Sequence, residues 1–197
     1  NYMTGIGQNL LIMKENLNRF LALDCATTNS GFALFQDNKP ITHGKLFFEG
    51  DTEYDKAMYA SQTMHAFLME WKVPVIVMES SFLGINPSVA TNLAISHGAV
   101  IGAAALSGVT SIASVVPIQW QMGIGNPRLT QEEKRAIMKE YPGKSAAWYK
   151  KAGAVARKER TIKIVKDSLG VSTRDHDVAD ALGIGLFVTK FPEKVKW

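Results

Sequence analysis

Two acidic residues end strongly apolar runs of this chain, and this placement constrains the fold more than any other feature of the sequence. Asp24 follows the apolar residues 20–23, and Glu79 follows the apolar residues 75–78. Short runs of this kind are typical of strands that are buried on both faces. A carboxylate at the end of such a strand needs a neutralising partner, because burial and neighbouring like charges both disfavour its ionised form.

Two further acids lie three positions apart near the C-terminus. Asp177 and Asp180 fall in a segment with helical spacing, which places both on one helix face. Carboxylate oxygens without a cluster of Cys or His favour Mg²⁺ or Mn²⁺ and argue against zinc. We therefore expect Asp24, Glu79, Asp177 and Asp180 to hold two such ions per site, as in two-metal phosphodiester hydrolysis.

The predicted elements alternate in an informative order. We expect strands at 20–24, 31–35 and 41–48, a helix at 52–71, a strand at 73–78, a helix at 86–105, a strand at 110–116, and helices at 129–140, 144–168 with a possible break at Gly153, and 175–190. This is the order of the α/β ribonuclease H-like fold, a five-stranded mixed sheet with three antiparallel strands, then parallel strands, flanked by helices. If the first and fourth strands are neighbours, Asp24 and Glu79 meet at their carboxyl ends.

The chain of 197 residues, 46% of them hydrophobic, is long enough for one sizeable core. We expect a tail or cloning remnant at 1–19, one domain at 20–190 and a C-terminal tail at 191–197. No apolar stretch free of charge is expected to span a bilayer, and the single Cys25 leaves no internal disulfide. These features suggest the cytoplasm of a bacterial or phage-infected cell, with an organellar or viral-factory location left open.

Positive charge is concentrated in one segment. The chain carries a net charge of +4, but residues 127–166 hold 12 Lys or Arg against 4 Glu, so the remainder sums to −4. Such a segment is typical of contact with a phosphate backbone, and the interleaved Trp120, Tyr141, Trp148 and Tyr149 suit stacking on bases. A solvated helix face with core aromatics explains the pattern equally well. The candidate DNA contacts are Arg128, Lys134, Arg135, Lys144, Lys150, Lys151, Arg157 and Lys163.

Several motifs resemble those of the RuvC family of Holliday-junction resolvases. From Glu79 the sequence reads ESSFLGINPSVATNLAISHG, which shares the family pattern ExxFxxxNxxxAxxL with a Gly five positions later. From Asp177 it reads DVADALGI, which matches DxADALxI. Leu23-Asp24 with Thr27 and Gly31, and Lys158 with Val165 and Leu169-Gly170, also fit, so the resemblance covers most of residues 20–190.

The resemblance implies a role for each matching residue. It implies that Asp24, Glu79, Asp177 and Asp180 are the catalytic metal ligands of an Mg-dependent endonuclease that resolves four-way junctions or other branched DNA. It further implies that Lys158 lies near the scissile phosphate and that Phe82 probes the branch point. A four-way junction has two symmetric cleavage points, so we expect a homodimer. The helix at 86–105 could supply its interface or pack on its own sheet.

The sequence also departs from the family pattern. The family's Asp-x-Gly is Asp24-Cys25-Ala26 here, and a basic helical insertion at about 127–155 has no counterpart in the short bacterial resolvases. Both departures indicate a divergent branch, of phage, viral or organellar origin.

Two other function classes are compatible with parts of this sequence. The segment from Asp24 to Gly31 is similar to the first phosphate loop of actin-like ATPases, but those proteins need two such domains and a second glycine-rich loop. A non-catalytic nucleic-acid-binding module of the same fold is the other alternative. Four acids in its cleft argue against it, because a binder of polyanions gains nothing from negative charge there.

Overall fold

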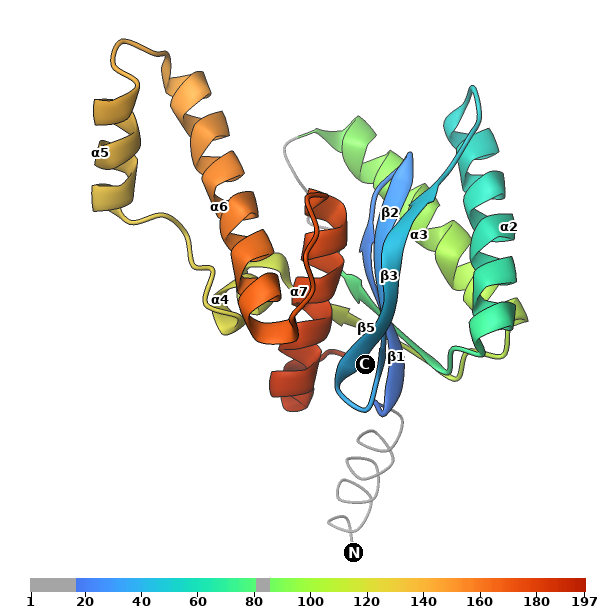
Figure 1. Cartoon of the computed structure of the whole chain (residues 1–197). Helices are drawn as coiled ribbons and strands as arrows, with labels where there is room; N and C mark the ends of the chain where they lie inside the picture. Colours follow the sequence, from blue (N-terminus) through green and yellow to red (C-terminus); the bar gives the residue numbers. More distant parts are fainter. Residues whose placement is uncertain (1–16, 81–85) are drawn as a thin grey trace, which may run out of the picture.

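The computed structural model describes residues 17–80 and 86–197. Its five strands form one sheet in the order β3-β2-β1-β4-β5, flanked by helices (Figure 1). The elements are β1 Arg19–Cys25, β2 Asn29–Gln36, β3 Lys39–Phe47, α2 Glu53–Trp71, β4 Val75–Glu79, α3 Pro87–Leu106, β5 Ser111–Val115, α4 Pro117–Gly123, α5 Gln131–Glu140, α6 Ala146–Leu169, α7 His176–Lys190 and the 3₁₀ turn η1 Pro192–Lys194.

The strand pairing confirms the predicted mixed sheet. β1 pairs antiparallel with β2, and β2 with β3, whereas β1–β4 and β4–β5 are parallel. The β2–β3 turn is tight because Asp37 and Asn38 both adopt positive φ, at 50° and 64°. Leu23 of β1 pairs with Met78 of β4, so the next residue of each strand is an acid at the same edge of the sheet.

Both faces of the sheet are covered, as the apolar runs predicted. Phe20 and Ala22 of β1 belong to a core shared with α7, while Leu21 and Leu23 belong to a second core shared with α2 and α3. This alternation follows from the two-residue period of a strand. α2 and α3 therefore cover one face, and α7, with α4 and α6 beside it, covers the other (Figure 1).

α7 approaches the sheet closely because glycine lies on both sides of the contact. A Cβ added at Gly31 of β2 would lie 2.1 Å from the backbone oxygen of Asp177, at the start of α7. Further along the helix, a Cβ at Gly185 would meet the Phe35 ring at 2.0 Å. Gly31 pairs with Asp24 in the sheet, so this contact brings the first turn of α7 beside Asp24.

Three details differ from the sequence-based expectation. α4 was not predicted, because a helix of only seven residues gives little periodic signal. α6 runs without a break through Gly153, since a single glycine costs a helix only about 1 kcal/mol.

α3 carries no charged residue and is long and apolar enough to span a bilayer by length and composition, so the expectation that no stretch qualifies was wrong. In this fold α3 packs beside α2 and buries Val100, Ala103 and Ala104.

α5 and the first half of α6 form a two-helix arm, defined here as residues 128–157, which projects from the sheet (Figure 1). α5 buries no residue, and α6 buries only Thr161 and Val165, both beyond the arm. Tyr141, Trp148 and Tyr149 pack on one another at the α5–α6 turn, with ring centroids 5.2 and 5.5 Å apart. The arm is thus held by local contacts and contributes little to the core.

The Gly31 contact generates a prediction about stability. Gly31→Ala is expected to lower the free energy of unfolding by about 1–3 kcal/mol, because backbone atoms of α7 must move to admit the methyl group. Urea unfolding measures this loss. Gly153→Ala is the matched control: its Cβ would meet only the flexible end of Leu129, at 3.1 Å, and its stability should stay within about 1 kcal/mol of the parent. Equal stability of the two variants would contradict the proposed close contact.

Candidate active site

The structure brings four sequence-predicted acids to one edge of the sheet. Asp24 is the second-to-last residue of β1, and Glu79 is the last residue of β4. Asp177 and Asp180 lie in the first turns of α7. All four side chains are partly buried. Asp24 is within electrostatic range of Asp177 and Asp180, and Glu79 is within range of Asp24 and Asp180.

Burial and mutual repulsion disfavour the ionised carboxylates. Burial, and then the charges of Asp180 and Asp177, raise the pKa of Asp24 from 3.8 to about 7, against Lys158 and Lys45, which lower it. Burial also raises the pKa of Asp180 to about 6, with a contribution from Glu79 and partial opposition from Lys158. The site therefore holds more negative charge than its protein surroundings neutralise.

Trp120 of α4 is a partner of the site that sequence reasoning assigned differently. Its indole Nε1 donates a hydrogen bond of 2.6 Å to Glu79 Oε2, and its side chain is completely buried. Burial and the charge of Asp24 raise the pKa of Glu79, and the hydrogen bond from Trp120 lowers it. The net result is a pKa of about 7. The suggestion that Trp120 stacks on bases is therefore wrong. Trp120 can hold Glu79 because α4 places its indole next to the last residue of β4.

Lys45 of β3 is a second contributor that the sequence did not reveal. Its ammonium lies 2.7 Å from Asp175 Oδ2 and 2.7 Å from Asp177 Oδ2. Asp175 is the N-cap of α7 and accepts backbone hydrogen bonds from Asp177 and Val178 at 2.9 and 3.2 Å. Lys45 thus ties the start of α7 to the sheet and neutralises part of the acidic edge. An alternating strand sequence does not mark such a lysine in advance.

Lys158 lies on α6, exposed, near the same acids. Its positive charge lowers the pKa of both Asp24 and Asp180, so it lies within electrostatic range of the site. Phe82, the expected branch-point probe, falls outside the described residues.

The donor chemistry of the site fits a hard divalent cation. The four side chains offer carboxylate oxygens only, and three of them have raised pKa values that a cation would reverse. Within residues 17–80 and 86–197, however, no three His, Cys, Asp or Glu side chains are arranged as ligands of a single ion. The ammonium of Lys45 already contacts Asp177 Oδ2, so a metal ion bound to this oxygen would compete with the lysine.

The predicted DNA contacts divide into two groups. Arg128, Lys134, Lys150 and Arg157 line one pocket of the arm. The others lie outside it on exposed positions of the arm and of α6, Lys144 with its ammonium 5.8 Å from the centre of the Trp148 ring. These others are Arg135, Lys144, Lys151 and Lys163.

Comparison with known proteins identifies the fold. No family model matches the sequence, and no curated protein matches it significantly. Among solved structures, T. thermophilus RuvC in complex with a Holliday junction substrate aligns over 90% of this chain and 98% of that chain, with a TM-score of 0.66 and 16% identity. The chain has the RuvC fold. A second Thermus thermophilus RuvC structure aligns over the same shares of the two chains, with a TM-score of 0.63 and 15% identity. In both cases the alignment covers nearly the whole of RuvC and nine-tenths of this chain.

The raised pKa of Asp24 generates a prediction about pH. Between about pH 4 and pH 7 the folded state keeps a proton on Asp24 that the unfolded state has released, so this group makes metal-free stability fall as pH rises. Asp24→Asn is therefore expected to be more stable than the parent at pH 8, by at most about 4 kcal/mol at about 1.4 kcal/mol per pKa unit.

Urea unfolding in EDTA at pH 4, 6 and 8 measures this difference. The gain from Asp24→Asn should grow from pH 4 to pH 8. Asp167→Asn, on an exposed position of α6, is the matched control for the loss of one carboxylate. If the two variants change stability alike at every pH, the carboxylate of Asp24 is not held in an unfavourable environment.

Proposed function

We propose that this protein is a metal-dependent endonuclease that cleaves branched DNA, with the four-way Holliday junction as its expected substrate. The observation that carries this proposal is the convergence of Asp24, Glu79, Asp177 and Asp180 at one edge of a RuvC-type sheet, beside Lys158. A cluster of buried, mutually repelling carboxylates weakens the fold unless cations bind it. Its presence therefore favours a catalytic site over a purely structural one.

We infer that the four acids hold two Mg²⁺ or Mn²⁺ ions. When bound, such a pair supplies an activated water and stabilises the leaving oxygen of a phosphodiester. Asp24 and Asp180 are each electrostatically coupled to the other three acids, so they are the central ligands of this arrangement. Trp120 holds one oxygen of Glu79 in place by its hydrogen bond. Lys158 offsets negative charge that develops on the phosphate.

A homodimer is part of the proposal, because a four-way junction presents two symmetric cleavage points. α3 is the candidate interface, because this helix is apolar and buries only Ser96, Val100, Ala103 and Ala104. Val89, Ile101 and Leu106 of this helix are exposed by 60%, 46% and 78%, although at about 100° per residue they point in three different directions around the helix axis.

The RuvC fold weakens the two rival functions. RuvC aligns with 90% of this chain at a TM-score of 0.66, which favours a RuvC-type nuclease over an actin-like ATPase. A module that only binds nucleic acid would gain from uncharged residues at Asp24 and Glu79, where burial raises both pKa values to about 7.

A cleavage assay tests the proposal. With Mg²⁺, the parent is expected to cut a synthetic four-way junction faster than a flap, a plain duplex or an RNA–DNA hybrid, and EDTA should stop the reaction. Asp24→Asn is expected to lower the cleavage rate by about 10²–10³ or more while junction binding remains, because a group that organises transition-state charge is lost. Asp167→Asn should cut like the parent.

Two results would contradict the proposal. If the parent leaves all branched substrates uncut but hydrolyses ATP, the endonuclease assignment is wrong. If Asp24→Asn cuts junctions as fast as Asp167→Asn, Asp24 does not belong to the catalytic site.

A further inference from the structure

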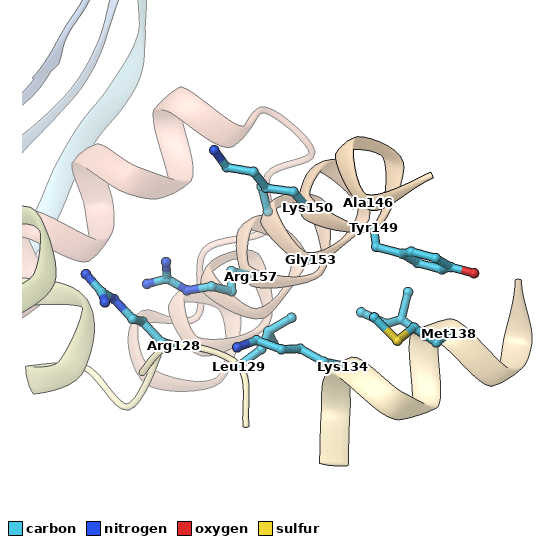
Figure 2. A pocket seen from close by; sticks show the side chains of 11 residues that line it. Arg128, Leu129, Lys134, Met138, Ala146, Tyr149, Lys150, Gly153 and Arg157 are labelled. Atoms are coloured by element: carbon cyan, nitrogen blue, oxygen red, sulfur yellow. The ribbon is translucent and has the colours of Figure 1, made fainter. Parts of the chain in front are cut away.

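The arm contains a pocket that the proposed cleavage reaction does not use. It lies between α5 and the first half of α6 and has a volume of about 570 Å³ (Figure 2). Leu129, Ile137 and Met138 reach it from the α5 side, and Tyr149 and Ala154 reach it from α6. This apolar lining is of the size and character that proteins use for small organic groups.

The rim of the pocket is cationic. Arg128, Lys134, Lys150 and Arg157 all line it, and none of its lining residues is acidic (Figure 2). A second pocket, on the other side of the α5–α6 pair, is lined by Glu140 and Lys151 and has no such excess of cations. The first pocket therefore combines an apolar floor with a rim suited to anions.

The pocket lies on the same helix, α6, as Lys158 of the candidate active site. Arg157 lies on its rim and directly precedes Lys158, which faces the acids. Burial, Arg128 and Arg160 lower the pKa of Arg157 while Asp180 opposes them, so Arg157 is in electrostatic range of both the rim and the acidic edge. Lys150 lies eight residues before Lys158 on α6, which corresponds to about 12 Å along the helix.

We propose that this pocket binds an unpaired nucleotide of the DNA strand that leaves the active site, with its base on the apolar floor and its phosphates on the cationic rim. This inference rests on the proposed cleavage of branched DNA. Only about 12 Å along α6 separates Lys150 from Lys158, so the bound nucleotide lies near the scissile phosphate.

Duplex DNA fits the pocket less well than an unpaired nucleotide. A duplex presents phosphates to the rim, but its bases are stacked on one another and leave the apolar floor without a partner. An unpaired base has a free face, and stacking on an aromatic or apolar side chain contributes about 1–3 kcal/mol per base. Tyr149 supplies the aromatic ring and is held by its hydroxyl, which donates a hydrogen bond of 2.6 Å to Tyr141 O.

Filling the pocket tests this proposal directly. Ala154→Trp fills it from α6, and Ala147→Trp is the matched control, because Ala147 is exposed on the same helix outside the pocket. In an Asp24→Asn background, fluorescence anisotropy compares a duplex with three unpaired thymidines at a branch and the same duplex fully paired. Ala154→Trp is expected to weaken binding of the branched probe at least tenfold and to leave the paired duplex unchanged. Ala147→Trp should change neither.

A pair of double variants tests the rim with equal loss of charge. Lys134→Gln with Lys150→Gln removes two pocket cations, and Arg135→Gln with Lys139→Gln removes two cations outside the pocket. The first pair is expected to reduce the slope of log affinity against log salt for the unpaired probe by about 1.4, at about 0.7 per phosphate contact. The second pair should reduce it by less than half as much. Equal effects of the two pairs would indicate diffuse charge attraction and overturn the proposal.

The two proposals can fail separately. If Ala154→Trp binds the unpaired probe as the Asp24→Asn parent does, the pocket does not bind nucleotides, even where the wild-type protein cuts junctions. If the wild-type protein cuts no branched DNA but Ala154→Trp abolishes binding of unpaired nucleotides, the pocket proposal holds and the cleavage proposal fails.

Discussion

The close approach of α7 to the sheet at Gly31 is the contact on which the site depends. With backbone atoms of Asp177 in the space where a Cβ would lie, the helix begins directly beside Asp24. Parallel pairing of β1 with β4 adds Glu79 from the other side. A displacement of α7 by even one side-chain layer would separate Asp177 and Asp180 from both strand-borne acids, since interiors are packed too densely to absorb such a shift.

The same contact creates an electrostatic conflict that the surrounding residues relieve only in part. Lys45 neutralises the outer acids at the start of α7, and Lys158 lowers the pKa of the inner ones. Trp120 satisfies one oxygen of Glu79 without adding charge. What remains is a partly buried excess of negative charge, and divalent cations are the ligands that resolve it without a change of fold.

The arm follows a different physical logic. It buries almost nothing. A capping box at Thr130 and the aromatic cluster at the α5–α6 turn stabilise it locally, and an ion pair joins Glu133 of α5 to Arg160, which lies on α6 just beyond the arm. Contacts of this kind hold a shape without contributing to the core. An arm that packs so little against the core is free to contact another molecule. Its cationic pocket, whose lining residues include no acid, agrees with such a contact.

The sequence by itself determined the order of the elements, the mixed sheet and the strand-end positions of Asp24 and Glu79, because apolar periodicity and capping residues act over a few neighbours. It also indicated that Asp177 and Asp180 share a helix face. Only the tertiary structure decided the roles of Lys45 and Trp120, because their partners are 41 to 132 positions away along the chain. Likewise, the pocket exists only where α5 folds back on α6. Local patterns specify elements, whereas contacts between distant segments specify the site, and no short window of sequence contains both partners of such a contact.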